Sequence, residues 1–322
     1  MQKFAPVPRA PWSDAVRRLE ESVAVAVKGK PEAVRLALTA FLARGHVLIE
    51  DVPGVGKTTL AQAVARSVGC TFQRIQFTSD LLPSDVLGVS VWNPKDAVFE
   101  FKRGPIFANV ILADEINRTT PKTQSCLLEA MSDGQVTIED ITHHLAPPFI
   151  VIATQNPVEH YGTYPLPESQ MDRFLLRITI GYPGDAVERQ ILQDRKSQAP
   201  IETVTQVASA SDVLAMQAAV DDVTVDPSID DYIIQVVRET RESPLLELGV
   251  STRGALGLHH AAKARAFLDG RAFVLPDDAK DLAVATFAHR VVVSRAHDTV
   301  GGMREEADRI IREILERIPI PS

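Results

Sequence analysis

The chain has 322 residues, of which 45% are hydrophobic and 24% charged, and its formal net charge is −8. The length allows two domains with a sizeable core, and the composition is typical of a globular protein. The acidic balance argues against constitutive binding to nucleic acid, and the two cysteines, Cys70 and Cys126, argue against a disulfide framework or a metal cluster. Because the sequence shows no signal-peptide pattern and no apolar run long enough to span a bilayer, we expect a cytoplasmic protein.

Two helices are predicted before the first strand. Apolar residues recur at helical spacing across residues 13–28, and Gly29 ends this helix. Residues 31–44 form the second helix, which stops at Gly45. A buried strand at residues 47–49 follows, and then a glycine-rich turn leads into a helix-forming segment at residues 59–66.

Strand, glycine loop, Lys-Thr and helix is the arrangement of a phosphate-binding P-loop, and the flanking elements disfavour a chance glycine-rich turn. Backbone N–H groups and the helix N-terminus attract phosphate oxygens. Lys57 supplies a charge for the β- and γ-phosphates, and the Thr58 hydroxyl can ligate Mg²⁺. We therefore assign nucleotide binding to Asp51, Val52, Pro53, Gly54, Val55, Gly56, Lys57, Thr58 and Thr59.

One position departs from the full P-loop pattern, which has glycine where this chain has Asp51. Aspartate tolerates left-handed backbone better than most residues, so we expect that the turn can still form.

Further strands are predicted at residues 71–78, 109–114, 149–153 and 173–180, with a helix at 122–131. Two hairpins are expected among them. The first covers residues 88–103 and turns at 93–96, and the second covers 135–145 and turns at 140–142. From the residues alone, each hairpin could equally be a simple edge decoration.

Two carboxylates, Asp114 and Glu115, end the buried strand at 109–114. Many strands end in solvated carboxylates, but downstream of a P-loop this pair predicts catalysis. Asp114 can hold Mg²⁺ through water, and Glu115 can act as the general base that polarises an attacking water. Asn156 follows the next buried strand, and strand ends share one edge of a parallel sheet. We therefore expect Asn156 beside the γ-phosphate, although Asn-Pro also begins ordinary turns.

After residue 182 helical periodicity dominates. Helices are expected at 186–196, 211–220, 228–242, 253–269, 276–293 and 300–317. We divide the chain into an N-terminal segment and helix (1–28), an α/β core (29–182) and a helical domain (183–322).

Several motifs together resemble the MoxR family of AAA+ ATPases, which belongs to the helix-2-insert group. The resemblance covers roughly residues 20–295. Its motifs are Glu50 to Thr58, Gln76 to Asp85, Ala113 to Arg118, Pro121 to Gln124, Ala153 to Pro157 and Leu166 to Phe174.

This resemblance implies a three-layer αβα P-loop core with a parallel sheet, followed by a small all-helical lid. Asn156 resembles sensor 1, and Arg173 resembles an arginine finger that reaches a neighbouring subunit's ATP, although Arg173 alone reads as an arginine on a solvated strand end. Arg253 resembles sensor 2, acting on its own or a neighbour's site, despite Thr252 and Gly254, which depart from the usual motif. The hairpins match the helix-2 insert and the pre-sensor-1 hairpin.

The resemblance further implies ATP hydrolysis with Mg²⁺ in a homo-oligomeric, hexameric ring that remodels a protein partner. Members of this family often act beside proteins that carry a von Willebrand factor A domain, which is the kind of partner that the resemblance implies. A nucleic-acid motor of the same group is an alternative that the net acidity and the lack of a zinc or helix-turn-helix module disfavour. A non-hydrolysing scaffold gated by ATP is a second alternative, which Glu115 and Arg173 disfavour. No guanine-reading Asn-Lys-x-Asp motif supports a GTPase.

Overall fold

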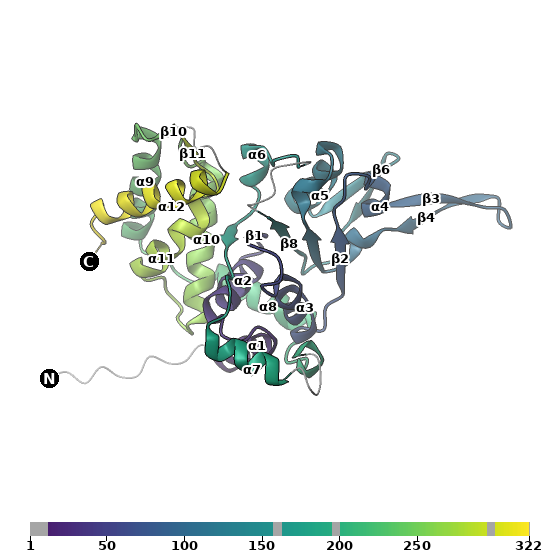
Figure 1. The fold of residues 1–322 in the computed structure, drawn as a ribbon, viewed down its shortest axis with the longest axis horizontal. Coiled ribbons are helices and arrows are strands. Elements are labelled where there is room, and N and C mark those ends of the chain that lie inside the picture. The colour runs from purple at the N-terminus through teal and green to yellow at the C-terminus, as the bar shows by residue number, and fades with distance from the viewer. Residues whose placement is uncertain (1–11, 157–162, 195–199, 295–299, 322) are drawn as a thin grey trace.

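The structure is a computed structural model that describes residues 12–156, 163–194, 200–294 and 300–321. Across these residues a five-stranded sheet has the order β2-β5-β8-β1-β9, and every pairing in it is parallel. Its strands are β1 (Val47–Glu50), β2 (Phe72–Gln76), β5 (Val110–Asp114), β8 (Ile150–Gln155) and β9 (Leu176–Ile178). The sheet lies at the centre of the molecule (Figure 1). The α/β core with a parallel sheet is therefore confirmed.

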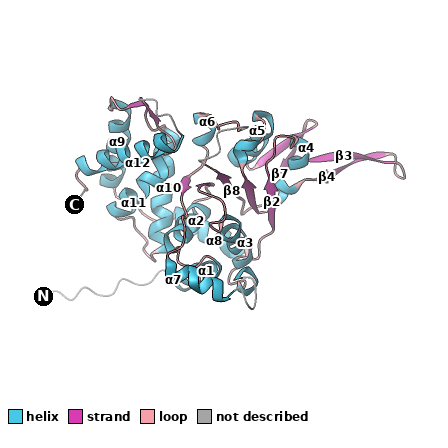
Figure 2. Cartoon of the chain, viewed as in Figure 1, coloured by secondary structure: helices cyan, strands magenta, loops and turns pink. Residues whose placement is uncertain are grey.

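Both faces of this sheet are covered, which explains why its strands are continuous apolar runs. Alternate residues such as Val47 and Ile49 face the helices α1 (Ser13–Ala26), α2 (Pro31–Leu42) and α3 (Lys57–Ser67). The intervening residues, such as Leu48 and Ile111, pack with α5 (Pro121–Asp133) on the other face. Figure 2 shows these helices on either side of the strands.

Both predicted hairpins are present. The first pairs β3 (Gly88–Asn93) with β4 (Val98–Arg103) after the short helix α4 (Pro83–Leu87), and it projects away from the body of the molecule (Figure 1). Gly88 is required at its base, because its φ is 106° and an added Cβ would lie 2.2 Å from the Lys102 carbonyl oxygen.

The second hairpin pairs β6 (Gln135–Ile138) with β7 (Ile141–His144). The turn expected at 140–142 lies instead at Glu139 and Asp140, whose φ values are 49° and 65°. Two-residue turns with positive φ at both positions match the twist of paired strands, and that geometry sets the register here.

The C-terminal half is largely helical, as expected. It contains α7 (Asp185–Asp194), α8 (Ala210–Asp221), α9 (Pro227–Glu242), α10 (Thr252–Leu268), α11 (Pro276–Phe287) and α12 (Val300–Arg317). The helix predicted at 276–293 ends at Phe287, because the β-branched run after it is extended. There β11 (Val292–Val293) pairs with β10 (Leu246–Leu248), a small antiparallel sheet that the sequence did not predict.

The α7–α8 region packs back on the core. The Ser22 hydroxyl donates to the Thr205 carbonyl at 2.9 Å, and the Val207 amide donates to the Ser67 carbonyl at 2.8 Å. The domain boundary at residue 182 stays a prediction, since the chain beyond it contributes to the same buried cluster as the core.

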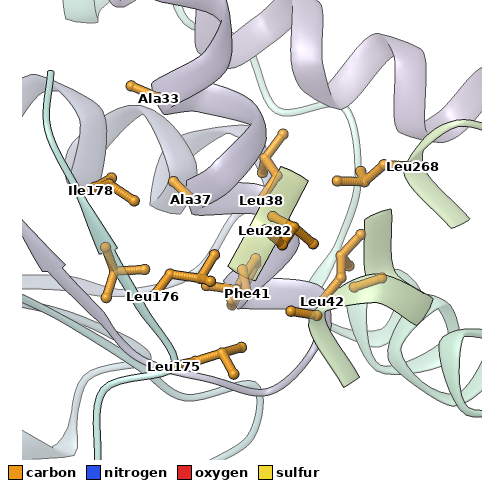
Figure 3. Packing of buried hydrophobic residues seen from close by; sticks show 14 of the residues in the cluster. Ala33, Ala37, Leu38, Phe41, Leu42, Leu175, Leu176, Ile178, Leu268 and Leu282 are labelled. Atoms are coloured by element: carbon orange, nitrogen blue, oxygen red, sulfur yellow. The ribbon is translucent and has the colours of Figure 1, made fainter. Parts of the chain in front are cut away.

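Helix α2 joins the sheet to the C-terminal helices. Figure 3 shows its residues Leu38, Phe41 and Leu42 gathered with Leu176 of β9 and Leu282 of α11, all within one buried cluster. Burying an aliphatic or aromatic side chain of this size contributes about 1.5–3 kcal/mol. The two halves of the chain are therefore held together by continuous apolar packing.

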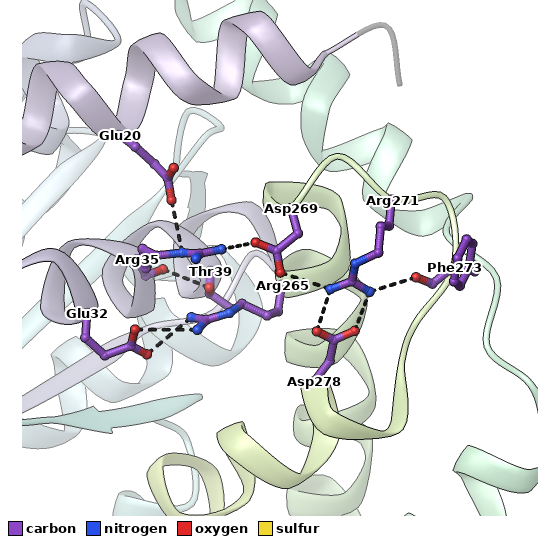
Figure 4. Close-up of polar contacts among 9 residues, drawn as sticks. All are labelled: Glu20, Glu32, Arg35, Thr39, Arg265, Asp269, Arg271, Phe273 and Asp278. Atoms are coloured by element: carbon purple, nitrogen blue, oxygen red, sulfur yellow. Dashed lines mark hydrogen bonds and ion pairs between the residues drawn. The ribbon is translucent and has the colours of Figure 1, made fainter. Parts of the chain in front are cut away.

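A charged network borders this apolar contact (Figure 4). Arg35 of α2 pairs with Asp269, and its Nε lies 3.2 Å from Glu20 Oε1 of α1. Arg271 donates both Nη atoms to the Asp278 carboxylate at 2.7 Å. The bidentate geometry fixes the turn between α10 and α11 where it meets the N-terminal helices.

Candidate functional site

The glycine loop between β1 and α3 has the backbone that a phosphate site needs. Gly54 and Gly56 have φ values of 85° and 98°, and an added Cβ at either position would meet nothing within 4 Å. The glycines are therefore needed for backbone conformation, while the space beside them is open to a ligand. Gly56 precedes the first turn of α3, so the N–H groups of that turn face the same space.

Asp51 holds the start of this loop in place through hydrogen bonds to backbone amides. Its carboxylate accepts the Val52 amide at 2.8 Å, the Ile180 amide at 2.7 Å and the Gly181 amide at 2.6 Å. Its carbonyl oxygen accepts Lys57 Nζ at 2.5 Å. The turn forms as expected, although Asp51 does not use left-handed backbone, because its φ is not positive. Asp51 replaces glycine because its carboxylate ties the loop to the chain leaving β9.

Asp114 is held at the end of β5 by its neighbours on both sides in the sheet. Arg74 of β2 donates to Asp114 Oδ2 through Nη2 at 2.5 Å and through Nε at 3.0 Å. From β8, the Thr154 hydroxyl donates to Asp114 Oδ1 at 2.6 Å. These bonds hold the carboxylate in one orientation at the carboxyl edge of the sheet.

Glu115 has left-handed backbone, with φ 57° and ψ 49°. Such geometry is uncommon for a residue with a side chain and clusters at functional sites. Its amide donates to Thr154 Oγ1 at 2.9 Å, which stabilises the turn. Glu115 Oε2 accepts Gln76 Nε2 at 2.7 Å and Arg118 Nη1 at 2.9 Å. The carboxylate is thus turned toward the pocket edge and engaged by donors.

These elements enclose a cavity of about 370 Å³. It is lined by Pro53, Gly54, Gly56, Lys57, Thr58, Thr59, Arg74, Asp114, Glu115 and Asn156. Asp51, Val52 and Val55 are not in this lining, because the Asp51 carboxylate bonds backbone amides and the two valines pack toward the apolar core. The structure therefore brings most of the predicted nucleotide-binding residues together with Asp114, Glu115 and Asn156.

The donor set fits Mg²⁺ bound together with a nucleotide. In the part of the chain that the structure describes, no group of three or more His, Cys, Asp or Glu residues could hold a metal by itself. Mg²⁺ is commonly bound through one carboxylate, water and substrate phosphates rather than by a protein cage. Thr58 and Asp114, which line the same cavity, are the oxygen ligands available for that arrangement.

Arg173 lies at the opposite edge of the sheet. It belongs to the turn before β9, not to the strand predicted at 173–180, and β9 runs parallel to β1, so residues before β9 lie away from the P-loop. Arg173 Nη1 donates to the Leu128 carbonyl at 2.5 Å and to Ser132 Oγ at 2.6 Å, both on α5. Within one chain, Arg173 is therefore separated from Lys57 by the length of the sheet.

Arg253 lies with Arg173 at this opposite edge. Both line a second cavity of about 260 Å³ that also includes Arg44, Asp172 and Arg290. Arg253 Nη1 is 3.8 Å from Asp172 Oδ2, and its side chain is 59% exposed. The structure thus separates the predicted residues into two groups, one at each edge.

Buried Arg290 organises the second group. Its Nε donates to Asp172 Oδ1 at 2.8 Å, and its Nη2 donates to the Phe174 carbonyl at 2.6 Å. Burial lowers the pKa of Arg290 to about 10, against the opposing effect of Asp172, so the side chain stays charged at neutral pH. It fixes the turn that carries Arg173.

Four residues that hold the site were not predicted from the sequence: Arg74, Gln76, Thr154 and Arg290. Arg74 and Gln76 are two residues apart on one predicted strand and so lie on the same face of the sheet. With the strand order known, this spacing would predict that both side chains lie near Asp114 and Glu115. Arg290 carries no local signal for this role, because Asp172 and Phe174, which it holds, are more than a hundred residues away in sequence.

The chain is similar in sequence to known ATPase domains and to several known proteins. The family "ATPase family associated with various cellular activities (AAA)" matches residues 46–176, and the AAA lid domain matches residues 238–314. The chain is 38% identical to chaperone MoxR1 of Mycobacterium tuberculosis, over 92% of this chain and 79% of that one. It is 31% identical to protein MoxR of Methylorubrum extorquens, over 96% of each.

The chain belongs to the MoxR family of AAA+ ATPases.

The chain is also similar over its whole fold to a crystal structure of a candidate ATPase from Cytophaga hutchinsonii. The two chains superpose with a TM-score of 0.87 at 37% identity, over 97% of this chain and 96% of that one. The AAA match includes the P-loop, the acidic pair, Asn156 and Arg173, and the lid match includes Arg253. Among the described residues, no helix is both long and apolar enough to cross a membrane.

Proposed function

We propose that this chain binds ATP with Mg²⁺, hydrolyses it in a homo-oligomeric ring and uses the cycle to remodel a protein partner. The observation that carries the proposal is the division of the site. The P-loop, Asp114, Glu115 and Asn156 meet at one sheet edge, while Arg173 and Arg253 meet at the other. Each chain then offers one half of a composite site.

The nucleotide half supports binding and activation of water. The open glycine loop and the α3 N-terminus suit phosphate oxygens, and Lys57 lines the same cavity. Bound Mg²⁺ would neutralise developing charge on the phosphates. Glu115 would accept a proton from the attacking water, and Asn156 would orient that water. Gln76 and Arg118 both donate to Glu115 Oε2 and so hold the carboxylate at the edge of the pocket.

The arginine half supports action between subunits. Arg173 lies at the edge remote from its own P-loop, so a neighbour's γ-phosphate is the phosphate that it can reach in a ring. Arg253 shares that cavity and would act on the same neighbouring site. A closed ring, hexameric in our proposal, lets every chain give one half and receive the other.

The partner is proposed to be a protein. A relative at 38% identity is named a chaperone, and family resemblance suggests a partner with a von Willebrand factor A domain. The projecting β3–β4 hairpin supplies exposed aromatic surface for such a contact, with Trp92 50% and Phe99 70% exposed. We place this activity in the cytoplasm. ATPase stimulation by DNA but not by protein would favour the alternative of a nucleic-acid motor.

Nucleotide binding is tested by thermal unfolding with and without Mg-ATP. At a hundredfold excess over Kd, ATP should stabilise the wild-type protein by about 2.7 kcal/mol. Lys57→Ala should lose this stabilisation. The control Lys102→Ala removes the same charge from the exposed hairpin and should keep it. A wild-type protein that ATP does not stabilise, or a shift that survives in Lys57→Ala, would contradict the proposal.

A further inference from the structure

Arg304, on the last helix of the lid, contacts the carboxyl edge of the core sheet. Its Nη2 lies 2.7 Å from Glu50 Oε1 and donates to Gln155 Oε1 at 3.0 Å. Glu50 is the last residue of β1, and Gln155 is the last residue of β8. One guanidinium from α12 therefore bridges two core strands.

These strand ends adjoin the nucleotide site. Glu50 and Gln155 are opposite each other in the parallel register of β1 and β8. Asp51, which follows Glu50, anchors the P-loop, and Asn156, which follows Gln155, lines the nucleotide cavity. Arg304 thus contacts the residues that directly precede Asp51 of the P-loop and Asn156. It can affect the distance between these two parts of the site, although it does not line the cavity itself.

A second ion-pair path joins α12 to the sheet. Arg177 of β9 pairs with Asp308, one turn after Arg304, and its Nη1 lies 3.5 Å from Glu50 Oε2. The Glu50 side chain is only 5% exposed and therefore receives both guanidinium groups in a buried setting. Burial raises the pKa of Glu50, while Arg304 and Arg177 oppose that rise. Removing one partner leaves a buried carboxylate poorly compensated, which makes the contact sensitive to lid position.

The fit of Arg304 leaves room for movement. A cavity of about 170 Å³ lies between sheet and lid, lined by Glu50, Glu168, Arg177, His289, Arg304 and apolar residues of both parts. The Arg304–Glu50 contact is a close ion pair without hydrogen-bond geometry, and Arg304 Nη1 has no hydrogen-bond partner. The guanidinium can therefore adopt a second arrangement without first breaking a fully bonded network.

We propose that Arg304 is a positioning residue that couples the lid to hydrolysis by setting the P-loop–Asn156 spacing through Glu50 and Gln155. The inference rests on the proposed ATPase function. When α12 is seated, the bridge holds the ends of β1 and β8 in register. When α12 withdraws, the bridge opens and Asn156 loses its set position. By reciprocity, nucleotide bound at the P-loop stabilises the seated position of α12.

The first test separates kcat from KM for ATP. Arg304→Ala should lower kcat roughly tenfold, within the range typical of coupling between sites, and leave KM within about threefold. Arg304→Lys should recover part of the loss, because lysine keeps the charge that pairs with Glu50 but lacks the rigid guanidinium plane that presents one nitrogen to both Glu50 and Gln155. The matched control is Arg309→Ala on the same helix, which removes ion pairs to Glu306 and Glu313. It should leave kcat unchanged.

Gln155→Leu shows whether Arg304 acts through the strand end. If it does, the double variant Gln155→Leu/Arg304→Ala should be no slower than the slower single variant, since both remove the same contact. If the losses of kcat in the two single variants instead multiply in the double variant, Arg304 does not act through Gln155. A normal kcat in Arg304→Ala, with an active wild-type protein, would overturn the inference itself. A wild-type protein that binds ATP but shows no turnover as an assembled ring would instead refute the proposed function.

Hydrogen exchange gives a readout that a merely structural role would not change. Mg-ATP should slow amide exchange along α12 in a Glu115→Gln background, in which nucleotide is retained. Arg304→Ala in that background should still bind ATP but lose the protection of α12. The same protection with and without Arg304 would overturn the coupling.

Discussion

The two edges of the central sheet differ in how their functional groups are held. At the carboxyl edge, Asp114 and Glu115 are bonded by side chains of neighbouring strands, such as Thr154 and Gln76. At the amino edge, Asp172 is held by lid residues, including Arg290 at 2.8 Å. The acidic pair at the first edge is thus held by core residues, whereas Asp172 at the second edge is held by the lid. The difference shows how a lid can control the arginines without touching its own chain's nucleotide.

The largest expected effect comes from the amino edge. Arg173→Ala should bind ATP normally yet hydrolyse it about 10³–10⁵-fold more slowly in assembled rings, because arginine fingers supply rate factors of this size. Steady-state turnover and ATP affinity measure the two properties separately. Arg238→Ala, which removes an exposed pair with Glu242 on α9, is the control and should retain activity. Loss of ATP affinity in Arg173→Ala would place Arg173 in its own chain's site and remove the distinction between the edges.

The next effect comes from the carboxyl edge. Glu115→Gln keeps the size and hydrogen bonding of the side chain but removes the proton acceptor, so turnover should fall about 10²–10⁴-fold with binding intact. Single-turnover hydrolysis measures the loss directly. Glu129→Gln, on the exposed side of α5, should turn over at the wild-type rate. Wild-type turnover by Glu115→Gln would mean that another group activates the water.

His46 provides a stability test at the amino edge. Its Nε2–H donates to the Met131 carbonyl at 2.9 Å, and its Nδ1 accepts the Val151 amide at 3.0 Å, so the ring is neutral. Burial lowers its pKa to about 4, compared with about 6.5 in the unfolded chain. The unfolded state therefore binds the extra proton, and stability falls as pH drops from about 6.5 to 4, by roughly 3 kcal/mol.

Urea unfolding at several pH values measures this effect. His46→Gln should be less stable than wild type at pH 7, and the gap should narrow toward pH 4 because glutamine does not titrate. Parallel pH profiles for the two proteins would contradict the buried, neutral assignment of His46.

The smallest effect on basal activity is expected at the β3–β4 hairpin. At its tip, Asn93 Nδ2 donates to Asp96 Oδ2 at 2.9 Å. The rings of Trp92 and Phe99 pack edge-on, with their centroids 5.1 Å apart. Replacing residues 93–96 with a Gly-Ser turn should leave basal ATPase within a few-fold, because the hairpin lines neither cavity at the sheet edges. Partner stimulation, and capture of a partner by the Glu115→Gln protein, should be lost. Intact capture with collapsed ATPase would make the hairpin a structural or subunit-contact element.

The carboxyl edge could be predicted from sequence because its signals are local. A P-loop, a strand ending in two acids and a strand ending in asparagine each lie within a few residues, and a parallel sheet brings strand ends together. The role of Asp51 was not predictable, since its carboxylate bonds amides about 130 residues away. The tolerance of aspartate for left-handed backbone is not what the loop uses, because the φ of Asp51 is not positive.

The amino edge could be predicted only through family resemblance. Arg173 alone resembled any arginine on a solvated strand end, and nothing local pairs Asp172 with Arg290 across more than a hundred residues. The small sheet of β10 and β11 was missed for the same reason, since its short strands pair across the lid. Arg304 also escaped prediction, because its helix reads as an amphipathic surface element until Glu50 and Gln155 are placed beside it.

Mixing two inactive variants tests most directly whether the two edges form one site between subunits. Lys57→Ala keeps the arginines but should lose nucleotide binding, whereas Arg173→Ala keeps the nucleotide pocket. If the site is composite, mixed rings should hydrolyse ATP at a substantial fraction of the wild-type rate, with a maximum at intermediate ratios. No recovered activity at any ratio, in rings shown to contain both variants, would contradict the account and place Arg173 in its own chain's site or in a structural role.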